Sequence, residues 1–156
     1  MVGVELGGAL KNVLAIACGV ADGLGFGANA RAAVITRGLA ELMRLGERMG
    51  CRRETFMGLA GIGDLVLTCT DDQSRNRRFG LAMARGLTVD EACAEIGQAV
   101  EGLHTAHAGA ALARRHGVDM PIVAQVDAVL HGGRDVQAAV RELLERDPKA
   151  EIAHGP

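Results

Sequence analysis

The stretch GVELGGALKNVLAIACGVADG, residues 3 to 23, decides the fold, because it predicts a long apolar helix. Between Leu6 and Ala21 it contains one charged residue, Lys11. Residues three, four and seven positions away share the helix face of Lys11. The neighbours at i−4, i−3, i+4 and i+7 are small: Gly7, Gly8, Ala15 and Cys18. Two glycines cost a helix about 1 kcal/mol each relative to alanine, so we expect another group to approach the backbone closely there.

Lys11 is also chemically distinctive within this chain. The 17 basic residues include only two lysines, Lys11 and Lys149. Arginine stays charged, whereas lysine can give up a proton, and burial brings its pKa toward the working range. Lys11 is therefore a candidate acid–base group. The alternative is an ordinary lysine whose ammonium reaches solvent along a core helix.

The composition predicts one helical domain. The chain has 156 residues, of which 49% are hydrophobic, with no Trp or Tyr and three Phe. This length is enough for a single core, and a core of small and aliphatic side chains is typical of closely packed helices. A net charge of −2 argues against a nucleic-acid-binding protein.

The cellular location is predicted from what the sequence lacks. The longest apolar run, Val13 to Ala21, is too short to span a bilayer, so we expect no stable membrane insertion. No basic region precedes the apolar N-terminus, as it would in a signal peptide. Four scattered cysteines without a CxxC pair are typical of free thiols in a reducing compartment. We therefore expect a cytoplasmic protein.

Periodicity and glycine breaks predict an all-α fold of seven or eight helices, with no strand longer than Leu65–Leu67. A helix at 31–49 is expected to have Asn29 as its N-cap and Gly50 as its stop. Further helices are expected at 53–59, 76–85, 89–97, 100–116, 121–131 and 136–146, with caps at Thr88, which forms a capping box with Glu91, and Asp135. We place the domain at residues 1–147 and a frayed tail at 148–156.

In the stretch GIGDLVLTCTDDQSRNRRFG, residues 61–80, Gly61, Gly63 and the polar cluster at 71–74 are expected to mark loops or turns, where functional residues tend to lie. Ser74, Arg75 and Asn76 precede or begin a predicted helix. A guanidinium binds two phosphate oxygens at once, and a helix N-terminus offers free N–H groups. The pattern therefore suits a phosphate, to which Arg77 and Arg78 would add positive field. The alternative is an ordinary N-cap with solvated arginines.

Three other features are candidates for a functional site: a carboxylate, a pair of histidines and a glycine-rich segment. Asp64 leads into apolar residues, and a buried carboxylate needs a partner, for which Lys11 is the natural choice. His104 and His107 share a helix face but lack further ligands, so we expect no metal site. GLAGIGDL resembles a dinucleotide-binding loop, but no predicted strand precedes it, so that reading is rejected.

Taken together, these residues resemble the C-terminal domain of the bacterial-type NAD(P)-dependent glycerol-3-phosphate dehydrogenases. The resemblance rests on residues 3–42, residues 58–80 and IGQAVEGLHTA at 96–106, and it extends to about Arg146. It implies a multi-helix fold like the C-terminal domain of 6-phosphogluconate dehydrogenase. It also implies an oxidoreductase that interconverts sn-glycerol 3-phosphate and dihydroxyacetone phosphate with NAD or NADP, and so supplies a glycerophospholipid precursor.

The resemblance further implies roles for individual residues. Lys11 would accept the proton of the C2 hydroxyl during oxidation and return it during reduction, and Asp64 would orient it. The implied substrate-binding residues are Lys11, Asn12, Asp64, Thr68, Ser74, Arg75 and Asn76. The implied cofactor-binding residues are Arg75, Ala99 and Glu101. Arginine suits the phosphate anchor because it keeps its charge, whereas lysine suits the base.

The sequence departs from the family pattern in one respect. It contains no strand–GxGxxG–helix unit with an acidic residue at ribose distance, and it lacks the further substrate-site lysine that the family supplies from its Rossmann domain. We therefore expect half of an enzyme, which folds but does not turn over alone, binds a small phosphorylated molecule and forms a homo-oligomer, a dimer. Two alternatives stay open: a non-catalytic helical dimerisation or scaffold domain, and the helical domain of a related hydroxy-acid dehydrogenase.

Overall fold

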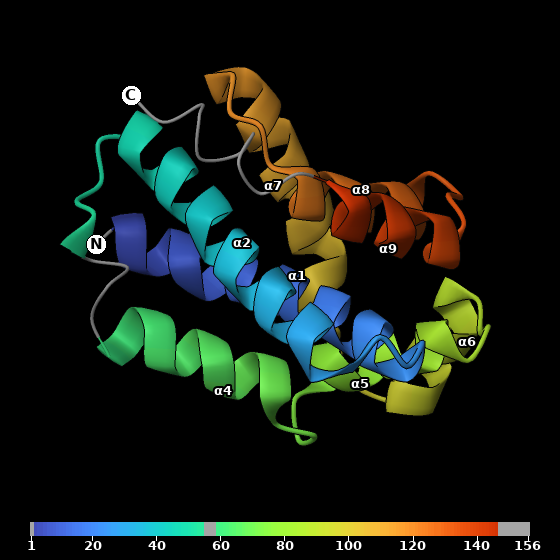
Figure 1. Cartoon of the computed structure of the whole chain (residues 1–156). Coiled ribbons are helices and arrows are strands. Elements are labelled where there is room, and N and C mark those ends of the chain that lie inside the picture. Colours follow the sequence, from blue (N-terminus) through green and yellow to red (C-terminus); the bar gives the residue numbers. More distant parts are fainter. Residues whose placement is uncertain (1, 55–58, 147–156) are drawn as a thin grey trace.

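The computed structural model describes residues 2–54 and 59–146, which form eight α-helices and one π-helical turn (Figure 1). The elements are α1 (Val2–Gly23), α2 (Gly27–Arg48), the π-turn η1 (Leu59–Gly63), α4 (Asp64–Thr70), α5 (Arg75–Ala84), α6 (Val89–Ile96), α7 (Glu101–His116), α8 (Pro121–His131) and α9 (Val136–Glu145). No strand occurs in these ranges, so the all-α prediction is confirmed. The predicted tail at 148–156 and most of the predicted segment at 53–59 lie outside the described residues.

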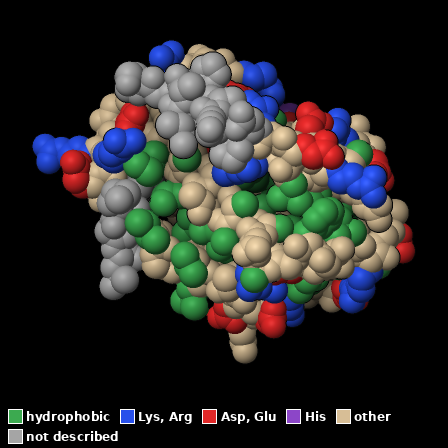
Figure 2. Space-filling model, in the orientation of Figure 1, with side chains coloured by type: hydrophobic (Ala, Val, Ile, Leu, Met, Phe, Trp, Pro, Cys, Tyr) green, Lys and Arg blue, Asp and Glu red, His purple; other side chains and the backbone are tan. Residues whose placement is uncertain are grey.

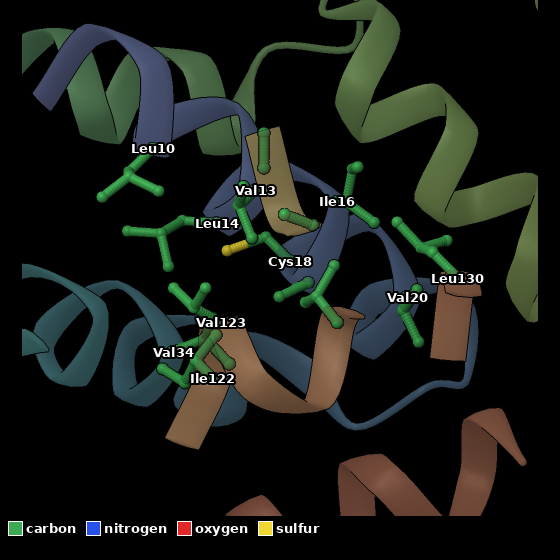
Figure 3. Packing of buried hydrophobic residues seen from close by; sticks show 14 of the residues in the cluster. Leu10, Val13, Leu14, Ile16, Cys18, Val20, Val34, Ile122, Val123 and Leu130 are labelled. Atoms are coloured by element: carbon green, nitrogen blue, oxygen red, sulfur yellow. The ribbon is translucent and has the colours of Figure 1, made fainter. Parts of the chain in front are cut away.

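Helix α1 is the centre of the fold, with α2, α4, α5, α7 and α8 packed around it (Figure 1). Every residue from Leu10 to Ala21 is buried except Lys11. A helix that is apolar on all sides must be surrounded by other elements. Figure 3 shows these side chains gathered around α1, with Val34 from α2 and Leu130 from α8 among them. The core therefore leaves Lys11 as the position at which this part of α1 reaches the surface.

Glycines bring α1 and α5 into backbone contact. A Cβ atom on Gly19 would lie 2.1 Å from the carbonyl oxygen of Arg77, and one on Gly80 would lie 2.2 Å from the carbonyl oxygen of Ile16. Because no side chain fits at either position, this crossing requires both glycines. It holds the start of α5 directly against α1.

At Gly8, the expected close approach does not come from the described part of the chain. A Cβ atom on Gly8 would meet no atom within 4 Å outside its own helix turn and neighbours, because this end of α1 faces open space. The bare face is also shorter than predicted, since Ala15 and Cys18 are fully buried. Of the four small neighbours of Lys11, Gly7 and Gly8 are partly exposed to solvent, whereas Ala15 and Cys18 are not.

The stretch at 61–70 is helical, so the prediction that Gly61 and Gly63 mark loops or turns is wrong, whereas the turn predicted at 71–74 is present. Gly61 and Gly63 lie in the π-turn, and α4 follows directly. The buried residues of α4 are Leu65 and Cys69, four positions apart. This is the spacing of a helix face, and packing against α1 outweighs the local glycine signals.

Most helix ends follow the predictions. The capping box of Thr88 and Glu91 is present, with both hydrogen bonds at 3.2 Å. Asp135 accepts a hydrogen bond from the Ala138 N–H at 3.0 Å, and Gly50 follows α2 with φ +84°. Asn29 is not the N-cap of α2, because the turn at Gly25, with φ +79°, lets that helix begin earlier, at Gly27.

The N-terminus of α8 is capped by a residue from α2. Met120 is the N-cap of α8 and supplies no side-chain hydrogen bond. Instead the buried carboxylate of Glu41 accepts hydrogen bonds from the N–H groups of Ile122, at 2.7 Å, and Val123, at 3.3 Å. A carboxylate at this point satisfies free N–H groups and faces the positive end of the helix dipole. Glu41 thereby ties α2 to α8.

The cysteines and the surface complete the description. All four cysteines are free thiols, as predicted, and Cys18 and Cys69 are buried. No helix within the described ranges is long and apolar enough to cross a membrane. Figure 2 shows hydrophobic side chains reaching the surface of the viewed face. The exposed large hydrophobic residues of the described chain are Phe26, Val66 and Leu67, the last two on the outer side of α4.

Candidate active site

An open cleft of about 530 Å³ lies where α1, α4, the start of α5 and the start of α7 meet. Its walls contain all but one of the site residues predicted from the sequence, and the remaining one, Asp64, is bonded to a wall residue. The lining residues are Gly8, Lys11, Asn12, Leu67, Thr68, Asp71, Gln73, Ser74, Arg75, Asn76, Ala99 and Glu101.

Lys11 and Asp64 form an ion pair, with the Lys11 ammonium donating to Oδ2 of Asp64. The pairing predicted from the sequence is confirmed. The predicted burial of Asp64 is wrong, since its side chain is 44% exposed and that of Lys11 is 28% exposed. Asp64 is the first residue of α4, at the edge of that helix and outside its buried face. A pair this exposed adds little stability, so its main effect is to orient the amine.

Two buried asparagines connect the cleft walls. Asn12 donates from Nδ2 to Oε2 of Glu101 at 3.1 Å, which links α1 to the start of α7. The Oδ1 atom of Asn76 accepts from the backbone N–H of Gly102 at 2.9 Å, which links α5 to the same helix. Because the N–H group of Gly102 requires an acceptor, the Asn76 oxygen must face it, and its NH₂ group is left to donate toward the cleft.

The start of α5 carries the predicted anion-binding features. Ser74 is the N-cap, and its hydroxyl accepts from the Arg77 N–H at 3.3 Å. Arg75 donates from Nη1 to Oε1 of Gln98 at 3.0 Å. Among the described residues that line the cleft, Arg75 is the cation without a carboxylate partner, because Lys11 pairs with Asp64. An anionic group is therefore favoured at the Arg75 end.

Arg77 does not add to that field, contrary to the prediction. Its guanidinium is buried and bonded to two carboxylates, those of Asp22 and Asp72. Burial opposes its charge, but the hydrogen bonds from Asp22 and Asp72 outweigh this effect and raise the pKa of Arg77. Its charge is thus balanced locally. Arg78 is exposed and is absent from the cleft walls.

The predicted histidines lie away from the cleft. The Nδ1 atom of His107 is 3.2 Å from Oδ1 of Asp127, and its ring lies against that of His131. His104 is exposed on the same helix. The described ranges hold no group of three or more His, Cys, Asp or Glu side chains placed to bind a metal ion.

Sequence reasoning missed several residues of the cleft walls: Leu67, Asp71 and Gln73, together with the Arg75 partner Gln98. A signal for two of them was present. Positions 64, 67, 68 and 71 follow the helical spacing i, i+3, i+4 and i+7, so a helix prediction for this segment would have placed them on one face. A loop prediction for this segment does not show that these four positions share a helix face.

Fold and cleft together define an all-helical domain, over the described residues, with an open polar cleft beside its central helix. The family model described as "NAD-dependent glycerol-3-phosphate dehydrogenase C-terminus" matches residues 1–141. The chain belongs to this family, and the resemblance read from the sequence is confirmed.

Individual relatives agree with the family assignment. The chain is 67% identical over 152 residues to the glycerol-3-phosphate dehydrogenase [NAD(P)+] of Thioalkalivibrio sulfidiphilus, covering 97% of this chain and 46% of that protein. It is 59% identical to the protein of the same name from Photobacterium profundum, covering 96% of this chain and 44% of that one.

Solved structures are similar over the same region. The crystal structure of glycerol-3-phosphate dehydrogenase from Coxiella burnetii matches with a TM-score of 0.91 and 58% identity, over 94% of this chain and 45% of that one. The enzyme from Saccharomyces cerevisiae matches with a TM-score of 0.82 and 32% identity, over 92% of this chain and 42% of that one. The chain thus spans less than half the length of the relatives it matches.

Proposed function

We propose that this chain is the substrate-binding half of an enzyme that interconverts sn-glycerol 3-phosphate and dihydroxyacetone phosphate with NAD or NADP. One observation carries the proposal: the amine of Lys11 and the guanidinium of Arg75, which has no carboxylate partner among the described residues, line the same cleft. A small molecule with a hydroxyl at one end and a phosphate at the other matches this arrangement. The family assignment supports the same substrate.

Lys11 is the base in this proposal. Oxidation removes a hydride from C2 while the C2 hydroxyl loses its proton, so a base must lie at that oxygen. Lys11 in its neutral form takes this proton, and the Asp64 carboxylate then holds the resulting ammonium. In the reverse direction the Lys11 ammonium donates the proton to the carbonyl oxygen. Thr68 and Asn12 line the same cleft, and we assign to them the contacts with the substrate hydroxyls.

The phosphate is assigned to the start of α5. Ser74, Arg75 and Asn76 all line the cleft there. Arg75 offers a permanent charge and two parallel N–H donors, and Asn76 offers its NH₂ group. The helix N-terminus adds favourable electrostatics for an anion.

A nicotinamide cofactor accepts or supplies the hydride when bound. The face of α1 at Gly8 is open, since no atom lies within 4 Å of a Cβ position there outside its own helix turn and neighbours, and this supports an assignment of the flat ring to that face. Ala99 and Glu101 at the start of α7 and Arg75 across the cleft are the residues that would contact the cofactor from this chain. Its remaining contacts are assigned to the part of the relatives that this chain does not match.

A substitution of Lys11 in the full-length enzyme separates the enzyme from the scaffold alternative. With Lys11→Ala we expect turnover to fall by about 10² or more, because the acid–base group is lost. A scaffold domain predicts a change in stability only. Arg85→Ala is the control, since the exposed Arg85–Glu95 pair lies outside the cleft walls. This chain on its own is expected to show no NADH-dependent reduction of dihydroxyacetone phosphate.

We also propose that the enzyme is a cytoplasmic homodimer that supplies glycerol 3-phosphate for glycerophospholipids. Four free thiols support a reducing compartment. The exposed hydrophobic residues Phe26 and Val66, which do not line the cleft, support burial of further surface in an assembly. Light scattering of the full-length enzyme tests the dimer: the mass of two subunits is expected, and a monomer at all concentrations would contradict it.

A further inference from the structure

Arg77 joins the three parts of the chain that carry the proposed substrate site. Its Nη1 atom donates to Oδ2 of Asp22 at 2.5 Å and to the carbonyl oxygen of Cys69 at 3.2 Å. Its Nε atom donates to Oδ1 of Asp72 at 3.1 Å. Asp22 belongs to the last turn of α1, Cys69 to the end of α4, and Asp72 to the turn that precedes α5.

We propose that Arg77 is a positioning residue, whose buried guanidinium sets the spacing between Lys11 on α1 and the anion-binding residues at the start of α5. The inference rests on the proposed function. Arg77 itself is absent from the cleft walls, so it acts through Arg75 and Asn76, its neighbours in the sequence.

The backbone of Arg77 is fixed as firmly as its side chain. Its N–H group is capped by the Ser74 hydroxyl at 3.3 Å. Its carbonyl oxygen lies against Gly19 of α1, where a Cβ atom would come within 2.1 Å. The start of α5 therefore cannot slide along α1 without a clash or the loss of these bonds. The turn at 71–74 is held to Arg77 by one further hydrogen bond, which the Arg77 side chain donates to Asp72.

The chemistry of the guanidinium explains why an arginine occupies this position. A planar fork with several N–H donors can bridge acceptors on separate elements, whereas a lysine ammonium is a single point charge. The same Oδ2 atom of Asp22 also accepts a hydrogen bond from Nη1 of Arg31 of α2 at 3.2 Å. An ion pair as buried as that of Arg77 and Asp22 often adds little net stability compared with apolar packing. Its proposed role is instead to fix the geometry of the cleft.

The test is steady-state kinetics of the full-length enzyme with Arg77→Lys and Asp72→Asn. For Arg77→Lys we expect the KM for glycerol 3-phosphate to rise about tenfold with kcat changed less than about threefold, because substrate alignment is lost while Lys11 is retained. Asp72→Asn is expected to change the KM in the same direction by about threefold. The Asp72 side chain is 82% exposed, so this variant retains the fold even if Arg77→Lys does not.

Two comparisons make the outcomes decisive. Arg85→Lys, at the exposed C-cap of the same helix, is expected to leave the KM unchanged. An unchanged KM in both Arg77→Lys and Asp72→Asn, alongside a raised KM in Arg75→Ala, overturns the positioning role and leaves the proposed function intact. If Arg75→Ala also leaves the KM unchanged, the proposed phosphate site itself is wrong. If Arg77→Lys does not fold, an unchanged KM in Asp72→Asn overturns the inference.

Discussion

Lys11 and Asp64 are 53 residues apart in the sequence, yet their side chains form an ion pair beside the cleft that Lys11 lines. The buried helix α1 fixes the position of Lys11, because every other residue from Leu10 to Ala21 is in the core. Leu65 and Cys69 fix α4 in the same way, by packing its buried face against α1. The packing thus orders the proposed base before any substrate binds, which lowers the entropic cost of reaction.

Arg75→Lys in the full-length enzyme tests the proposed phosphate anchor. Lysine keeps the charge but loses the two parallel N–H donors. We expect the KM for glycerol 3-phosphate to rise about tenfold or more, with a smaller change in kcat. Arg78→Lys is the matched control, because Arg78 is exposed on the same helix and is not part of the cleft walls. Equal KM values for the two variants would remove Arg75 from the phosphate site.

Gly19→Ala is expected to destabilise the chain, because its Cβ atom would lie 2.1 Å from the carbonyl oxygen of Arg77. Overpacking of this kind costs about 1–3 kcal/mol. Urea denaturation followed by circular dichroism measures the change. Unaltered stability would show that α1 and α5 do not require this backbone contact.

Gly8→Ala, on the same helix, is expected to have the opposite effect on stability. Its Cβ atom would meet nothing within 4 Å beyond its own helix turn and neighbours, and alanine favours a helix over glycine by about 0.5–1 kcal/mol. The variant should therefore unfold at a higher urea concentration. Because Gly8 lines the cleft, the same substitution in the full-length enzyme should lower kcat/KM by roughly tenfold. Full activity would show that this open face is not used.

Glu41→Gln is expected to destabilise the fold by about 1–3 kcal/mol. The amide keeps one acceptor oxygen, but its NH₂ group is a poor match for the N–H groups of Ile122 and Val123, which Glu41 satisfies with two oxygens. Glu47→Gln is the control, since its pair with Arg53 is exposed and should matter by less than about 0.5 kcal/mol. Similar midpoints for both variants would refute the capping role.

Cys69 gives stability a dependence on alkaline pH. A hydrogen bond with Cys18, together with burial, raises the pKa of the Cys69 thiol far above its ordinary value of 9.0. The unfolded chain loses this proton near pH 9 while the folded chain keeps it. The thiol's contribution is therefore fully present below pH 9 and is lost above it, by about 1.4 kcal/mol per pH unit.

Denaturation curves at pH 8 to 10 measure this dependence, and Cys69→Ala supplies the comparison. The variant is expected to lose stability less steeply above pH 9 than the unchanged chain. Identical slopes for the two proteins would show that Cys69 titrates normally in the folded state.

The parts of the structure that could be predicted from the sequence are those that local patterns control. The run around Lys11 and the caps at Thr88 and Asp135 depend on spacing within one segment, and all three are confirmed. The pairing of Lys11 with Asp64 was predicted from charge balance together with the family resemblance, and it is confirmed as well.

Other features depend on contacts between distant segments, which local patterns do not reveal. Residues 64–70 form a helix because Leu65 and Cys69 pack against α1, although the preceding glycines indicate loops. Glu41 caps a helix that begins 80 residues later, and no local pattern predicts such a partner. Arg77 was interpreted as a surface charge because its carboxylate partner Asp22 lies 55 residues away.

The central claim is that one small molecule bridges Lys11 and the start of α5. A crystal structure of the full-length enzyme with glycerol 3-phosphate and the nicotinamide cofactor tests it most directly. The account predicts the C2 oxygen within about 2.6–3.2 Å of Lys11 Nζ and the phosphate on Arg75 and Asn76. A phosphate bound elsewhere, or a C2 oxygen out of reach of Lys11, would contradict it.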